Sequence, residues 1–208
     1  MTFLMPLQTF GRVEANYIGG VTSSAVNNSV SGSFNFGAED ENRIILVGAY
    51  AGIGVSPPST VSLSGVTIAG NSSTIIYSTS GGPSNSNAFG IAIANIPAGT
   101  SGTIAAGFTA SGSISVANKA IVAYSIYNSR GVSNTIVLGG SIGSPPGGAI
   151  IGLSALFGST GTLVWTGVSK DGQSGNLTGG SLSAEDELAP FTVTCNGTVG
   201  RVYLFEAG

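Results

Sequence analysis

The chain contains no histidine, and charged residues occupy only 7% of its 208 positions. Catalysis by general acids and bases depends on side chains that exchange protons near neutral pH, and histidine is the most common of them. A Ser-His-Asp triad is therefore excluded. Most other positions hold Gly, Ser, Thr, Ala, Ile, Val or Asn, which suit packed β-sheets joined by many turns. The composition predicts an all-β protein that is not an enzyme.

The few charges also limit the partners that the chain can bind. The Lys and Arg residues are scattered singly along a chain with a pI near 4.6; they are Arg12, Arg43, Lys119, Arg130, Lys170 and Arg201. Nucleic-acid binding needs clustered cations that neutralise phosphates, so no nucleic-acid partner is predicted. The longest apolar stretch, residues 147–157, is short and interrupted by Gly and Ser, which predicts no membrane partner.

Short runs of β-branched residues recur between clusters of Gly, Pro, Asn and Ser, a pattern typical of an antiparallel β-sandwich. The run 43–50 is apolar on both faces, which predicts a central strand that is covered on both sides. In the run 89–96, Phe89, Ile91 and Ile93 share one face, and Gly or Ala alternates with them on the other. Strands are predicted over residues 43–50, 60–68, 73–77, 89–96, 103–109 and 120–127.

A hairpin is predicted near the C-terminus. Residues 191–195 and 198–205 both alternate apolar and polar positions, and Asn196-Gly197 separates them. Asn-Gly between alternating runs is the strongest short hairpin signal, because both residues tolerate a positive φ.

The whole chain, residues 1–208, is predicted to form a single β-sandwich domain, since sandwiches of this length are often one domain. Residues 1–40 are a candidate N-terminal arm or attachment segment. The pairs Pro57-Pro58 and Pro145-Pro146 predict loops, because proline cannot donate to a central ladder. A composition shift near residues 128–133 is a possible division, but the residues after it are expected to add strands to the same sandwich.

Several of these segments together resemble a loose group of β-sandwich proteins that are common in tailed bacteriophages. The segments are Asp40–Gly48, Val61–Ile68, Ala94–Ile104, Ala120–Ile126 and the tryptophan-containing Leu163–Gly167. The resemblance spans about residues 40 to 205 and is a pattern of strands and turns rather than a catalytic motif. Ser64 departs from it, since this position often holds an aromatic residue in the group, and the subfamily stays open.

The resemblance implies a jelly-roll-like β-sandwich and a structural role on a virion, as a capsid decoration, head spike, fibre or tail-associated component. It also implies that the partners are other virion proteins and copies of the chain itself. The alternative is a carbohydrate- or receptor-binding module that contacts a host surface glycan. Its candidate binding residues are the aromatic side chains of Tyr17, Tyr50, Tyr77, Tyr124, Tyr127 and Trp165.

The carboxylates gather mostly in two clusters, 39–41 and 185–187. A glycosidase needs two carboxylates that face each other across a substrate, and calcium needs several oxygens that converge on one loop. Adjacent acids at a strand entrance point in different directions, so they are expected to be solvated, with calcium as the alternative. The run 171–176 is rich in oxygen but lacks the acidic spacing of a calcium loop. No catalytic, cofactor-binding or metal-ligating residue is assigned.

Two further side chains are predicted to be structural. Cys195 lies in an alternating run without a neighbouring cation, so it is expected to be a buried thiol rather than a reactive one. Trp165 alternates like a strand residue, and packing in a core or interface is favoured over stacking on a sugar.

Overall fold

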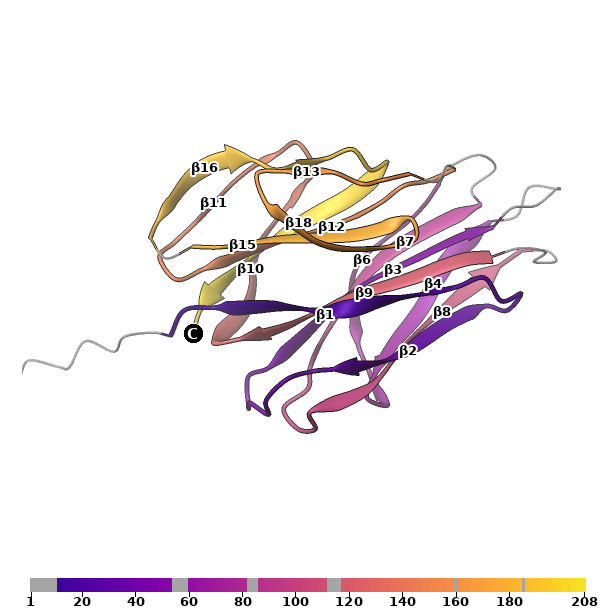
Figure 1. The fold of residues 1–208 in the computed structure, drawn as a ribbon, viewed down its shortest axis with the longest axis horizontal. Coiled ribbons are helices and arrows are strands. Elements are labelled where there is room, and N and C mark those ends of the chain that lie inside the picture. Colours follow the sequence, from indigo (N-terminus) through magenta and orange to yellow (C-terminus); the bar gives the residue numbers. More distant parts are fainter. Residues whose placement is uncertain (1–10, 54–59, 82–85, 112–116, 159–160, 185) are drawn as a thin grey trace, which may run out of the picture.

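The computed structural model describes residues 11–53, 60–81, 86–111, 117–158, 161–184 and 186–208. Throughout these residues the regular structure consists of strands in antiparallel sheets, and the sheets pack on one another in layers (Figure 1). The prediction of an all-β, antiparallel sandwich is confirmed.

Residues 14–127 form two sheets. The central sheet has the order β1 (Glu14–Ser23), β9 (Ala117–Tyr127), β3 (Ile44–Ile53), β7 (Asn87–Asn95) and β6 (Thr74–Gly81). The flanking sheet has the order β2 (Ser29–Asn35), β8 (Ser101–Ala110), β4 (Val61–Ile68) and β5 (Asn71–Ser72).

The pairing between these strands is nested. Of the nine described strands in these two sheets, the first, β1, pairs with the last, β9, and the second, β2, pairs with β8. In turn β3 pairs with β9 and β4 pairs with β8, so the first four strands alternate between the two sheets. This arrangement is a jelly roll, as expected.

The residues after 128 build further layers. The C-terminal sheet has the order β10 (Ser129–Val137), β18 (Val199–Ala207), β12 (Ala149–Ala155), β15 (Leu177–Ser183) and β14 (Ser169–Ser174). Two short ladders lie beyond it, β11 (Ser141–Ser144) with β16 (Leu188–Thr192) and β13 (Trp165–Thr166) with β17 (Thr194–Cys195). In Figure 1 the orange and yellow C-terminal strands lie above the indigo-to-magenta jelly roll. These residues therefore pack on the sandwich instead of adding strands to its two sheets, which corrects the sequence-based expectation.

The composition shift near residues 128–133 marks this change of layer. Asn128 has a φ of 54° and turns the chain from β9 in the central sheet to β10 in the C-terminal sheet. Asparagine is among the few residues that adopt this left-handed conformation readily.

The prediction of an N-terminal arm over residues 1–40 is wrong for the strands β1 (Glu14–Ser23) and β2 (Ser29–Asn35). Strand β1 pairs with β9 along its whole run, and β2 pairs with β8, so both are integral to the jelly roll. The buried side chains of Val30 and Phe34 belong to its core. The first ten residues lie outside the described part of the chain.

The central sheet is buried on both faces because its strands carry apolar side chains at consecutive positions. On β3, Ile45 and Val47 face the flanking sheet, whereas Leu46 and Tyr50 face the C-terminal sheet. The prediction of a central strand covered on both sides is confirmed. On β7 the large side chains Phe89 and Ile91 also face the C-terminal sheet, as their shared face in the sequence indicated.

The outermost layer packs on the far side of the C-terminal sheet. There Trp165 lies over Gly152 of β12, where a Cβ atom would stand 2.6 Å from the indole ring. Trp165 is buried, and its Nε1 donates a hydrogen bond to Thr178 Oγ1 at 3.3 Å. The tryptophan is a core residue, as predicted.

The loop predicted at Pro145-Pro146 is a tight turn between β11 and β12. The amide of Gly148 donates to the carbonyl of Pro145 at 3.1 Å, and Gly147 has a φ of 76°. Proline followed by a glycine with positive φ is the signature of a type II turn. The other pair, Pro57-Pro58, lies outside the described residues.

The predicted C-terminal hairpin is wrong. Strand β17 pairs with β13, and β18 pairs with β10 and β12 instead of with β17. The Asn196 side chain accepts from the amide of Val164 and donates to the carbonyl of Thr162. The Asn-Gly step therefore carries the chain from the outermost layer to the C-terminal sheet, since tertiary hydrogen bonds outweigh the local turn preference.

A substitution at Gly152 tests how closely the outermost layer packs. Gly152→Ala should lower the free energy of unfolding by about 1–3 kcal/mol, because the new methyl group collides with the rigid Trp165 ring. Gly65→Ala is the matched control in strand β4, where a Cβ meets no atom within 4 Å. Urea unfolding of both variants measures the difference, and equal effects would contradict this packing.

Candidate functional site

Arg43, which precedes β3, is fully buried and serves the fold. Its guanidinium donates to the backbone carbonyls of Ile96, Gly37, Ala38, Ala98 and Gly99, with distances of 2.5–3.3 Å. It also lies 5.7 Å from the centroid of the Phe36 ring. The cation thus ties the loop after β2 to the loop after β7, and its donors are occupied by backbone rather than directed at a cleft.

Lys119 on β9 is the second buried cation. Its Nζ donates to the carbonyl of Ala25 at 2.6 Å and to that of Asn27 at 2.8 Å. Burial lowers the pKa of this lysine, because desolvation disfavours the ammonium form. Lys119 holds the turn between β1 and β2 against the central sheet.

The acidic residues form no joint site in the described part of the chain. Glu39 accepts from the amide of Gly99, and Asp40 accepts from the amide of Asn42 in a short turn. Asp186 and Glu187 are exposed, and Glu185 lies outside the described residues. Among the described residues, no group of three or more His, Cys, Asp or Glu side chains is placed to hold a metal ion.

The oxygen-rich run 171–176 belongs to the hairpin of β14 and β15 and not to a calcium loop. Asp171 accepts a hydrogen bond of 2.8 Å from the hydroxyl of buried Tyr124, which fastens the hairpin to the central sheet. Gly175 has a φ of 54° and makes the turn.

The six aromatic candidates for glycan binding do not form an exposed platform. Tyr50, Tyr124 and Trp165 are buried. The other three are half-buried and already packed or bonded: Tyr17 lies edge-on to Tyr124 at 5.5 Å, Tyr77 lies under the Arg201 guanidinium at 4.0 Å, and Tyr127 donates to the carbonyl of Phe36. Sugar stacking needs a free ring face, which the buried rings of Tyr50, Tyr124 and Trp165 do not offer.

Cys195 is half-buried on β17 rather than fully buried as predicted. It packs at the border of the outermost core, beside Trp165 across the ladder. The prediction of a buried thiol is therefore wrong in the degree of burial, although Cys195 packs against this core.

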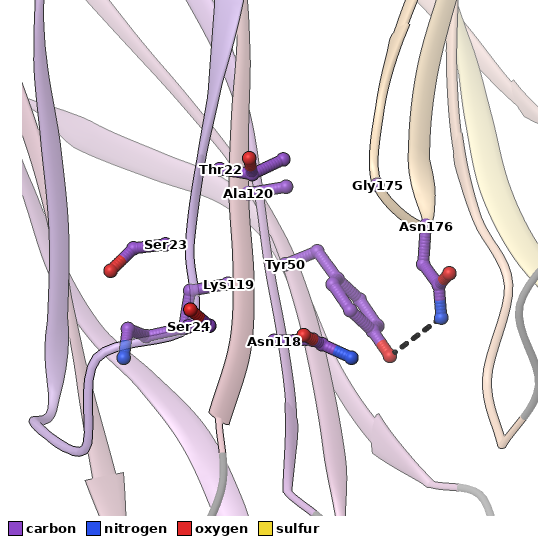
Figure 2. A pocket seen from close by; sticks show the side chains of 9 residues that line it. All are labelled: Thr22, Ser23, Ser24, Tyr50, Asn118, Lys119, Ala120, Gly175 and Asn176. Carbon is purple, nitrogen blue, oxygen red and sulfur yellow. Dashed lines mark hydrogen bonds between the residues drawn. The ribbon is translucent and has the colours of Figure 1, made fainter.

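A cavity of about 410 Å³ opens at one end of the molecule, where the central and C-terminal sheets meet. We call it the interlayer pocket (Figure 2). Its lining comes from β1 and the turn after it, from β3, from the start of β9 and from the β14–β15 turn: Thr22, Ser23, Ser24, Tyr50, Asn118, Lys119, Ala120, Gly175 and Asn176.

The floor of the interlayer pocket is held by a buried hydrogen-bond chain. The Tyr50 hydroxyl donates to Asn87 Oδ1 at 2.8 Å and accepts from Asn176 Nδ2 at 3.2 Å. Asn176 Nδ2 also donates to the carbonyl of Leu156. Burial raises the pKa of Tyr50, although the bond from Asn176 lowers it in part, so the phenol stays protonated at neutral pH.

The sequence contains no signal for this pocket. Its polar groups come from four distant segments. The sequence singled out Tyr50 as a candidate for ring stacking and Asn176 as part of an oxygen-rich run, and neither interpretation indicated this pocket. Figure 2 shows the side chains of Asn118, Tyr50 and Asn176 turned toward one another across the gap.

Comparisons of the chain with family models, with curated proteins and with solved structures find no match. In the described part of the chain, no helix has the length and apolar character needed to span a membrane.

The buried tyrosines predict a loss of stability at alkaline pH. Burial raises the pKa of Tyr17, Tyr50, Tyr124 and Tyr203 above the ordinary value of 10.0. Above pH 10 the unfolded state therefore binds fewer protons than the folded state, and the free energy of unfolding should fall. The lowered pKa of Lys119 has the opposite effect, because the unfolded state then binds the extra proton and the free energy of unfolding rises with pH. This effect ends above the ordinary lysine pKa of 10.5, where both states have lost the proton.

Phenolate absorbance and circular dichroism, followed together during a titration, check this prediction. Ionisation of the buried tyrosines should coincide with loss of the β-sheet signal. Full ionisation of all tyrosines while the sheet signal is intact would contradict the burial described above.

Replacing the buried arginine should destabilise the fold strongly. Arg43→Met removes the donors from several buried carbonyls, and a loss of about 2–4 kcal/mol is expected. Thr67→Met, at an exposed position of β4, should change the free energy of unfolding by less than about 0.5 kcal/mol. Similar losses in both variants would show that the hydrogen bonds from Arg43 to the backbone carbonyls do not stabilise the loops after β2 and β7.

Proposed function

We propose that this protein is a non-enzymatic structural component of a bacteriophage virion that associates with copies of itself and with other virion proteins. The observation that carries the proposal is a pair of neighbouring edge strands that expose aliphatic side chains, β6 of the jelly roll and β10 of the C-terminal sheet. The resemblance to phage sandwich proteins supports a place on a virion. The exposed aliphatic side chains support association between copies of the chain.

The two edges lie beside each other on the molecule. Tyr77 of β6 contacts Arg201 of β18, which pairs with Val137 of β10. Ile75 and Ile76 are each 37% exposed on β6, and Val137 is 55% exposed on β10. Exposed aliphatic groups that cluster at a sheet edge are typical of protein–protein contacts.

Both edges also carry a register shift, after Ile75 on β6 and around Val132 on β10. Such bulges oppose the extension of a ladder into a neighbouring copy. The association is therefore expected to use side-chain packing rather than a continuous intermolecular sheet, which favours closed assemblies over fibres.

The low charge supports the same role. With a net charge of −3, copies of this chain repel one another little when they are crowded on a particle. The buried cations Arg43 and Lys119 are committed to backbone carbonyls, so they contribute to the fold and not to acid–base chemistry. We therefore expect no catalytic activity.

The carbohydrate- or receptor-binding module remains the second candidate. The burial and packing of its six aromatic candidates weigh against a module of the ring-stacking type. We therefore place it behind the structural role.

Self-association of the purified protein tests the assembly surface. Mass photometry should show oligomers at micromolar concentration, and Ile76→Asp should shift the population toward monomers by about tenfold in the association constant, because it places a charge in an apolar contact. Thr67→Asp, an exposed position on β4, is the control that should leave the oligomers intact.

Immunogold labelling of particles released from the host that carries the gene tests the virion setting. Gold on the particles is expected. A monomeric protein that stays in the soluble fraction and labels no particle would contradict the proposal.

A further inference from the structure

We infer that the interlayer pocket is a binding site for a neutral polyhydroxylated ligand, of the size of one or two sugar units of a glycan. This inference is independent of the assembly proposed for the β6 and β10 edges. It differs from the ring-stacking mode expected from the sequence, because the pocket recognises its ligand through hydrogen bonds.

The lining of the pocket consists mainly of hydroxyl and amide groups. Thr22 and Ser24 contribute hydroxyls at the rim, and Asn118 contributes an amide. Ser23 Oγ accepts from the amide of Ala25, and the Asn176 amide donates to Tyr50 and Leu156, so these two side chains shape the pocket. Hydroxyls donate and accept, and a primary amide does both through separate atoms. The exposed hydroxyls and amide of this rim match the paired donor and acceptor character of a sugar hydroxyl, whereas an apolar ligand would displace water from them without replacing its hydrogen bonds.

The charges around the pocket favour a neutral ligand. Among the described residues that line it there is no carboxylate, and the ionisable groups are Lys119 and the protonated Tyr50. The Lys119 ammonium donates to the carbonyls of Ala25 and Asn27, and Figure 2 shows its side chain directed away from Tyr50 and Asn176. An anionic ligand would have to compete with these carbonyls for the ammonium group.

The floor is rigid and the rim is accessible. Tyr50 and Asn176 are buried and joined through the hydrogen-bond chain to Asn87 and Leu156. Thr22, Ser24 and Asn118 are exposed around the opening. A preformed polar floor reduces the ordering cost of binding, which is the usual design of a small-ligand site.

The volume suits a small ligand. At about 410 Å³ the cavity falls within the range of roughly 300–1,000 Å³ that is usual for such sites. Binding of a single sugar through a few hydrogen bonds is expected to be weak, in the millimolar range, and to gain strength when many copies of the chain act together.

Saturation-transfer difference NMR on the full-length protein tests the site, because it detects weak ligands on assemblies of any size. The probes are methyl α-glucopyranoside, methyl β-galactopyranoside and methyl N-acetyl-β-glucosaminide, with methyl β-glucuronide as the anionic comparison. At least one neutral glycoside should receive saturation from the wild-type protein.

Two pocket variants and one control locate the binding. Ser24→Phe fills the opening and should abolish the transfer, whereas Ser62→Phe makes the same change at an exposed serine of β4 and should preserve it. Asn118→Ala removes one amide and should weaken binding about tenfold. Asn118→Ala is the second test should Ser24→Phe fail to fold.

Three results would overturn the inference. These are no transfer to any neutral glycoside, transfer that persists unchanged in the pocket variants, or transfer to the glucuronide alone. Mass photometry of Ser24→Phe keeps the two proposals apart, because oligomers should persist in this variant whether or not the sugar binds.

Discussion

The structure depends on the burial of the central sheet on both of its faces. Strands β3, β7 and β9 carry apolar side chains at consecutive positions, so a sheet covered on one side only would leave a second row of large side chains in water. Each such side chain is stabilised by about 1.5–3 kcal/mol when it is buried. The jelly roll by itself covers one face, and the C-terminal sheet is what covers the other.

That requirement explains features of the C-terminal half that look unfavourable in isolation. Strands β14 and β15 are rich in glycine and short of β-branched residues, which is a poor composition for strands. Gly172 and Gly179 lie directly against the rings of Tyr17 and Tyr124, where any Cβ would collide. These glycines let the C-terminal sheet approach the central sheet closely, and the hydroxyl of Tyr124 donates a hydrogen bond to Asp171 between the two sheets.

The same facts show how far sequence reasoning reaches. The strands between residues 43 and 127 were predictable because short runs of apolar and β-branched residues recur there between clusters of Gly, Pro, Asn and Ser. The glycine-rich strands lack such runs, and the Asn196-Gly197 step gave a hairpin signal that its tertiary hydrogen bonds override. The interlayer pocket was not predictable, because its groups come together only through the packing of β1, β3, β9 and the β14–β15 turn. The absence of histidine, by contrast, was informative from the start, since it directed attention away from acid–base chemistry.

Native-state hydrogen exchange tests the dependence of the central sheet on its second cover most directly. If the C-terminal sheet completes the core, the amides of β12 and β18 should exchange with the same opening free energy as those of β3 and β9, through a single cooperative unfolding. Exchange of β12 and β18 at a clearly lower opening free energy, with β3 and β9 still protected, would contradict this account.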